Sequence, residues 1–207
     1  MKRAALLLLM LALTGCGGGG GSSATTTQLA RPSTIWPAPS DAMKRTRLAG
    51  LTPERHEFVF LHVHAHLDIF RNGTPVSVPG GIGINIDDPA VKRFKEPNGS
   101  IGYGGISQPC AKPCISPLHT HSNDGILHTE AKKDQFNTLG EFFTEWDVRL
   151  DRDCIGVYCR PKTPVAVYVD GEKLDGDPRR ITLENGREIA IVIGTAPEEI
   201  PAQFPSS

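Results

Sequence analysis

The chain lacks a dominant charge of one sign and a second long apolar run. It has 22 Lys and Arg residues against 23 Asp and Glu residues, so its formal net charge is −1. This balance provides no basic surface for nucleic acid, which excludes that class of partner. The one extended apolar run, residues 4–13, is too short to span a bilayer.

Methionine is scarce, because the chain has three and only Met43 lies beyond residue 15. A methionine-rich relay for copper(I) is therefore not expected, since that soft ion prefers sulfur ligands. The pattern of two histidines, one cysteine and a weak axial methionine, typical of electron-transfer copper sites, is not evident either.

The start of the chain resembles a bacterial lipoprotein signal. Lys2 and Arg3 precede the apolar run, and Leu13-Thr-Gly-Cys16 ends it. We expect residues 1–15 to be a signal peptide and Cys16 to carry lipid, which predicts a cell-envelope location outside the cytoplasm. An ordinary secretory signal followed by a coincidental cysteine is the alternative. Removal of residues 1–15 would leave 192 residues with a net charge of −3.

The rest of the chain divides by composition. Residues 16–39 are rich in Gly, Ser, Thr and Pro, which predicts a flexible tether. Residues 40–207 are expected to form a single His-rich, disulfide-stapled globular domain with a core of its own. The lipid on Cys16 would be its only contact with the membrane, and no protein partner is indicated.

Four cysteines follow the expected lipidation site: Cys110, Cys114, Cys154 and Cys159. Outside the cytoplasm an even number suggests two disulfides, and four cysteines leave three pairings open. A competing interpretation is a zinc site made by the first two cysteines with His119 and His121.

Alternation predicts several strands. Residues 58–70 place alternate apolar residues on one side, typical of a strand with one buried face. Asn72-Gly73 then predicts a type I′ turn that pairs Ile69 with Val76. Further hairpins are predicted at residues 165–174, around Asp170-Gly171, and at residues 181–193, around Asn185-Gly186. Residues 82–86 suggest a short strand, and residues 87–117 have no clear period and predict a loop.

Helix signals are few. Thr138-Leu-Gly-Glu141 is typical of a capping box, and the helix it opens would turn Leu139, Phe142, Phe143 and Trp146 toward the core. A short helix is also indicated over residues 41–49. Because hairpins outnumber helices, the expected fold class is α+β, with mainly antiparallel β-hairpins packed with one short helix.

Six of the seven histidines fall in two short segments: His62, His64 and His66, then His119, His121 and His128. Asp124-Gly125 predicts a two-residue turn that pairs His128 with His121 and Glu130 with His119. Side chains alternate along a strand, so these four would share one face. The sequence therefore predicts a metal platform.

Strand geometry limits which histidines can act together. Alternate residues lie roughly 6.6–6.8 Å apart, so His62, His64 and His66 span about 13 Å and are not all expected to bind one ion. Two of them with one or two from the second segment form a better ligand set. Zinc is the leading candidate and copper(II) follows, although imidazoles also suit nickel and iron.

Four segments together resemble a largely uncharacterised group of small secreted or lipid-anchored bacterial proteins: His62-Val-His-Ala-His66, Leu118-His-Thr-His121, Gly125-Ile-Leu-His128-Thr-Glu130 and residues 138–146. The resemblance covers about residues 58–193. It implies no established activity.

Three functions remain open. The leading hypothesis is an extracytoplasmic, lipid-anchored protein that holds zinc or copper(II) for capture or handling, through His64, His66, His119, His121 and His128, with His62 beside or within the site. The second is a hydrolase or hydratase that uses a metal-activated water with Glu130 assisting. The third is a structural surface module without metal.

Overall fold

The computed structural model describes residues 34–205. The expected signal peptide, Cys16 and residues 17–33 of the expected tether lie outside this range. Within it, the chain has an α+β fold that is mostly β, as predicted. No helix in residues 34–205 has the length and apolar character needed to cross a membrane.

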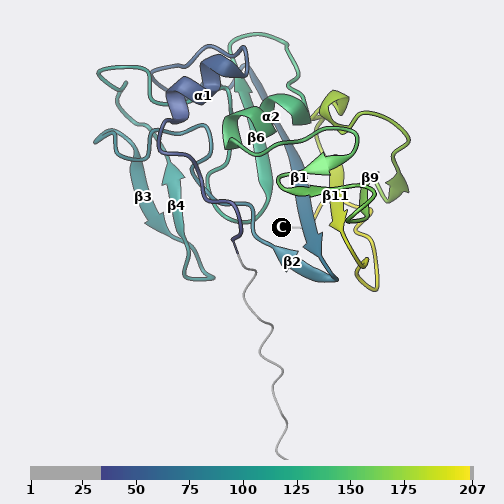
Figure 1. The fold of residues 1–207 in the computed structure, drawn as a ribbon. Helices are drawn as coiled ribbons and strands as arrows, with labels where there is room; N and C mark the ends of the chain where they lie inside the picture. The colour runs from purple at the N-terminus through teal and green to yellow at the C-terminus, as the bar shows by residue number, and fades with distance from the viewer. Residues whose placement is uncertain (1–33, 206–207) are drawn as a thin grey trace, which may run out of the picture. The chain divides into compact units, whose positions relative to one another are not determined.

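A seven-stranded sheet forms the centre of the fold, in the order β10-β9-β11-β1-β6-β5, with β2 paired to β1 (Figure 1). Its members are β1 (Leu61–Arg71), β2 (Thr74–Val76), β5 (Leu118–His119), β6 (Ile126–Ala131), β9 (Val165–Val169), β10 (Glu172–Lys173) and β11 (Glu188–Ile193). The strand β1 pairs antiparallel with β6 and parallel with β11. All other pairs in this sheet are antiparallel.

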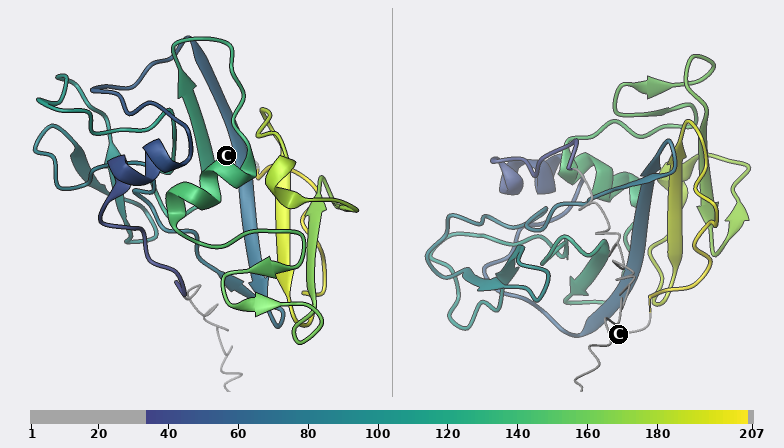
Figure 2. Two further views of the ribbon diagram at one scale, coloured as in Figure 1. Left: turned by 45° about the horizontal axis from the view of Figure 1, so that its top comes forward. Right: turned by 90° about the horizontal axis from the view of Figure 1, so that it is seen from below.

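Strand β1 divides the sheet into an apolar face and a polar face, as its alternation predicts. Val63, Ala65, Leu67 and Ile69 are buried on the apolar face. That face packs against α2 (Leu139–Trp146), whose capping box and four core residues are as expected. Figure 2 shows α2 lying against the sheet, with α1 (Ala42–Leu48) on the same side. The apolar face thus makes the main core and leaves the histidines on the other face.

The opposite face is shared between the histidines and the C-terminal tail. Ile200 packs against Phe70, Ala190 and Val192, and the Phe204 ring lies edge-on to His66 with centroids 6.2 Å apart. The tail therefore covers the β11 side of this face, and the side over β6 and β5 is left to the histidines.

Two hairpins follow their turn signals. Asn72 and Gly73 both have positive φ, and Ile69 pairs with Val76 as predicted. Asp170 and Gly171 also both have positive φ, in the turn between the antiparallel strands β9 and β10. Asn-Gly and Asp-Gly fit these turns because both central residues must adopt φ > 0.

The hairpin predicted over residues 181–193 is wrong. Only Gly186 of its turn has positive φ, and the Asn185 side chain instead accepts a hydrogen bond from the His64 backbone N–H. The 3₁₀ helix η1 (Pro178–Arg180) precedes Ile181, whose carbonyl accepts from Leu139 at the start of α2. All six residues of β11 are buried, which is typical of a strand that is covered on both faces.

The region predicted as loop contains a separate hairpin of β3 (Lys92–Lys95) and β4 (Ile101–Gly104), on the β6 side of the sheet in Figure 1. Asn98-Gly99 lies in the longer turn between these strands, where only Gly99 of the two has positive φ. The strand predicted at residues 82–86 is wrong, because Ile84 makes only an isolated bridge to Ile115.

Both pairs of cysteines form local disulfides, Cys110–Cys114 and Cys154–Cys159. The second links β7 (Cys154–Ile155) to β8 (Tyr158–Cys159). The competing zinc interpretation is wrong, because the sulfur atoms of Cys110 and Cys114 are bonded to each other and provide no thiolate.

Candidate metal centre

Three neighbouring strands bring the histidines together. Across β1 and β6, His64 lies opposite His128 and His62 opposite Glu130. Across β6 and β5, His128 lies opposite His119. Strands stand about 4.8 Å apart, so these pairings form a compact array of donors on one face of the sheet.

The predicted register of the His119–His128 hairpin is wrong by two residues, because His128 pairs with His119 instead of His121. Gly125 has positive φ but Asp124 does not. The Asp124 side chain accepts from the Ile126 backbone N–H and the Ser122 hydroxyl, which builds a longer turn. A shift of two residues preserves the face on which each side chain lies, so the donors still converge.

The donors form two adjoining groups in which the ligand atoms all lie within 4.8 Å of one another. The inner group comprises His119, His121, His128 and Glu130, and the outer group comprises His62, His64 and His128. Side-chain exposure ranges from 0% for His119 to 42% for His62. The array therefore runs from a buried end at β5 to an exposed end at β1.

Backbone carbonyls fix the tautomers of two inner histidines. His119 Nδ1 donates to the Ser116 oxygen at 2.9 Å, and His121 Nδ1 donates to the Tyr103 oxygen at 2.6 Å. A carbonyl oxygen can only accept, so in the neutral rings both Nε2 atoms carry lone pairs. These two Nε2 atoms lie 3.2 Å apart. Facing lone pairs at that distance need a positive charge between or beside them, as a proton or a metal ion supplies.

Glu130 provides negative charge at the same point. Its Oε1 atom lies 3.9 Å from His119 Nε2, 3.8 Å from His121 Nε2 and 3.7 Å from His128 Nδ1. Burial raises the pKa of Glu130, but the facing rings of His121 and His128 outweigh burial and hold it well below its ordinary value. The carboxylate is therefore ionised, which is the form that ligates metal.

His128 contributes a ring nitrogen that has no hydrogen-bond partner. In the part of the chain that the structure describes, its buried Nδ1 atom has no hydrogen-bond partner. Burial, opposed by Glu130, lowers the pKa of His128, and burial with the adjacent rings of His121 and His128 lowers that of His119 far more. Both rings are therefore neutral at pH 7, as metal ligands must be.

The outer group is less constrained. His62 Nε2 and His64 Nε2 lie 2.9 Å apart, and Glu130 Oε1 lies 3.3 Å from His62 Nε2. Burial, with the charges of His128 and His62, lowers the pKa of His64. Within residues 34–205, these two rings contact each other, and His62 contacts Glu130, but neither has a backbone-carbonyl contact of the kind that holds His119 and His121.

His66 lies apart from both groups, with Asp68 and Glu188. Its Nδ1 binds Glu188 Oε2 at 2.8 Å and its Nε2 donates to the Asp124 carbonyl at 2.9 Å. Burial opposes ionisation of this ring, but Glu188 outweighs burial and raises the pKa of His66. Both nitrogens of His66 are thus engaged, one with the Glu188 carboxylate and one with the Asp124 carbonyl.

The sequence did not predict which residues orient the His119 and His121 rings. Ser116 and Tyr103 act through backbone oxygens, which no side-chain motif reports. One signal was available, because Gly102, Gly104 and Gly105 surround Tyr103. A Cβ atom on Gly104 would lie 2.4 Å from His121 Nδ1, so glycine is required there for the close approach.

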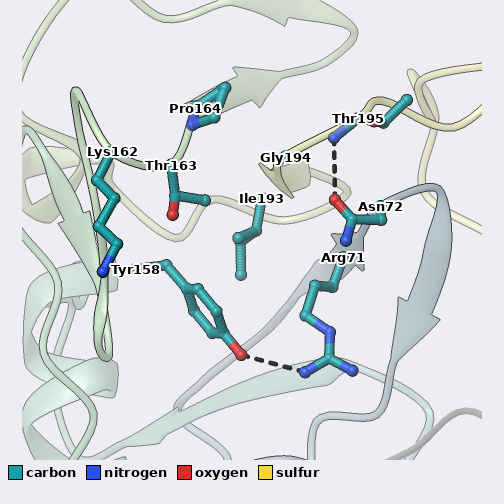
Figure 3. Close-up of a pocket in the computed structure, with 9 residues that line it drawn as sticks. All are labelled: Arg71, Asn72, Tyr158, Lys162, Thr163, Pro164, Ile193, Gly194 and Thr195. Carbon is teal, nitrogen blue, oxygen red and sulfur yellow. Dashed lines mark hydrogen bonds between the residues drawn. The ribbon is translucent and has the colours of Figure 1, made fainter.

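A separate pocket of about 610 Å³ lies at the other end of β1, lined by residues including Arg71, Tyr158 and Lys162 (Figure 3). Arg71 donates to the Tyr158 hydroxyl across it. His64, the nearer of the two β1 donors, is seven residues along the extended strand from Arg71, or about 23 Å. This pocket therefore cannot hold a substrate for chemistry at the histidines.

Comparison of the chain with protein-family models, with curated proteins and with solved structures finds no match in any of the three. What the protein does is therefore inferred from its own residues.

Proposed function

We propose that this protein is an extracytoplasmic, lipid-anchored metal-binding protein that holds zinc or copper(II) for capture or handling. The inner group, His119, His121, His128 and Glu130, is its holding site. The facing Nε2 atoms of His119 and His121 carry this proposal, because their fixed tautomers leave two lone pairs directed at one point.

The spacing of these atoms supports a metal ion. Four ligands placed tetrahedrally at zinc–nitrogen distances of about 2.0–2.1 Å lie about 3.3–3.4 Å from one another. The His119–His121 separation is 3.2 Å, and Glu130 Oε1 lies 3.7–3.9 Å from the three inner nitrogens. Metal-bound histidines commonly donate their second N–H to a backbone carbonyl, as His119 and His121 do here.

Handling is favoured over catalysis by the number of donors. Three imidazoles and one carboxylate fill a tetrahedral shell, whereas catalytic zinc keeps one position open for water. Glu130 faces the imidazole nitrogens as a ligand would. In that role it would not be free to act as a base.

The proposed location rests on the start of the sequence and on the cysteines. The Leu13-Thr-Gly-Cys16 pattern supports lipidation. Two disulfides support an oxidising compartment. Mass spectrometry of the purified protein would test this part, with an acylated N-terminal Cys16 as the expected result. Retention of residues 1–15, or cleavage elsewhere, would contradict it.

Elemental analysis tests the metal site. The full chain, produced without a polyhistidine tag and extracted in mild detergent, should contain tightly held zinc or copper at one ion per chain or more. After chelation it should rebind that metal with a dissociation constant below about micromolar. Absence of metal with no rebinding would contradict the proposal and leave the histidines as a polar network.

A further inference from the structure

The donors outnumber what one ion can bind in this arrangement. Five histidines and one glutamate form the two adjoining groups: His62, His64, His119, His121, His128 and Glu130. Nitrogen ligands of one zinc ion lie within about 4.2 Å of one another, twice a zinc–nitrogen bond of about 2.1 Å. The six residues fall into two groups, so His62 and His64 are not ligands of the ion in the holding site.

The topology explains this division. The residues from the central strand β6, His128 and Glu130, have a row of donors on each side. His119 and His121 lie on the β5 side, and His62 and His64 on the β1 side. The outer strands β1 and β5 are separated by two strand spacings, or about 10 Å. This is the layout of a dinuclear centre, with terminal histidine ligands on either side of a shared carboxylate, Glu130.

Glu130 faces both sides. The same Oε1 atom lies 3.3 Å from His62 Nε2 and 3.8 Å from His121 Nε2. Two-metal sites hold their ions about 3.5–4 Å apart, a spacing that a shared carboxylate can bridge. His128 belongs to both groups as well, and its ring centroid lies 4.4 Å from that of His64 and 4.4 Å from that of His121.

We propose that a second divalent ion, zinc or copper(II), binds in the outer group through His62 and His64, next to the holding site and sharing the Glu130 carboxylate with it. This inference rests on the proposed function and adds a stoichiometry of two ions per chain. The outer rings are partly exposed and lack carbonyl contacts to their Nδ1 atoms, so the outer ion binds more weakly and exchanges faster than the inner one.

Titration of the full chain with zinc tests the proposal, with free zinc set by a competing chelator. The metal-free chain should take up two equivalents, the second with a dissociation constant at least tenfold larger. The His62→Ala/His64→Ala variant should take up one equivalent of zinc, with the affinity of the tighter step.

The His62→Gln/His64→Gln variant keeps polar side chains at both positions and should likewise take up one equivalent. His56→Ala is the matched control, because His56 lies outside both groups, and it should retain two equivalents.

Copper(II) provides an independent measurement. Two copper(II) ions in adjoining groups should couple magnetically, so the electron paramagnetic resonance signal should be broadened at two equivalents and sharp at one. The double alanine variant should give only the sharp, isolated signal.

The outcomes separate the two proposals. One equivalent in both the unaltered chain and the double variant would overturn the second ion and leave the holding site in place. Loss of all binding in a folded double variant would also overturn it, by showing one centre that needs the outer rings. No binding by the unaltered chain would overturn the proposed function itself.

Discussion

The two ends of the histidine array use the same side chain in different ways. At the β5 end, His119 is buried and His121 is half-buried, and each has its Nδ1 fixed by a backbone oxygen. At β1, His62 is 42% exposed, and it contacts His64 and Glu130 through its Nε2 atom. Because hydrogen bonds behind metal ligands orient them and tune their basicity, the first end is better suited than the second to hold a metal ion.

The largest effect is expected from removing inner ligands. His121→Ala with His128→Ala removes two of the four inner donors, so stoichiometric zinc should be lost, as measured by equilibrium dialysis. The fold should persist, because the core lies on the other face of the sheet, and circular dichroism would check this. Retained tight zinc in that variant would show that the ligands are assigned wrongly.

A smaller effect is expected when only the support of an inner ligand is altered. Gly104→Ala places a Cβ atom 2.4 Å from His121 Nδ1 and should displace the ring from Tyr103. Loss of a hydrogen bond that orients a metal ligand typically lowers metal affinity 10–100-fold. Competition with a chelator would measure this loss.

Gly50→Ala is the matched control for Gly104→Ala. Gly50 also has positive φ, but nothing lies within 4 Å of its added Cβ. Its zinc affinity should be unchanged. Equal losses in both variants would attribute the effect to backbone strain instead of to His121.

Acidification should weaken metal binding gradually. Protons compete with metal for imidazole, and burial lowers the pKa values of His119 and His128. A lowered pKa keeps these two rings neutral below their ordinary pKa of 6.5, which favours retention of zinc. Burial also opposes ionisation of His121, but Glu130 and the Tyr103 carbonyl outweigh burial and raise its pKa. His121 should therefore be the first inner ligand to be protonated, and the site should lose affinity before it releases zinc. Zinc titrations at pH 7.5, 6.0 and 5.0 would measure this, and complete release already at pH 6.0 would contradict it.

The smallest effect on metal affinity is expected from substitution of Glu145, a buried residue of α2. Burial raises its pKa to about 8, against the opposing hydroxyls of Ser116 and Thr46. The folded state thus binds this proton more tightly than the unfolded chain does, so the contribution to stability is present below pH 4.5 and is lost as the pH rises toward 8.

Glu145→Gln should therefore stabilise the fold at pH 8, by on the order of a few kcal/mol, and leave it almost unchanged at pH 4.5. Zinc affinity should be unaffected, because the His119 ring is held by the backbone oxygen of Ser116 and not by the Ser116 side chain. Urea unfolding at the two pH values would measure the difference, and parallel pH profiles for both proteins would contradict it.

Local patterns predicted much of the fold. The alternation in residues 58–70, the Asn72-Gly73 turn and the capping box at Thr138 each depend on neighbours in sequence, and each is present. The hairpin at residues 181–193 failed because β11 is placed by its distant partners β1 and β9. Turn signals carry no information about such pairings.

The sequence by itself determined which residues could share the site. Alternation fixed the faces of His62, His64, His128 and Glu130, and a register error of two residues left those faces unchanged. Only the tertiary structure decided that β6 lies between β1 and β5, that His66 joins Glu188, and that carbonyls of Ser116 and Tyr103 orient the inner rings. These depend on long-range pairing and on backbone atoms that every residue has, so no residue pattern encodes them.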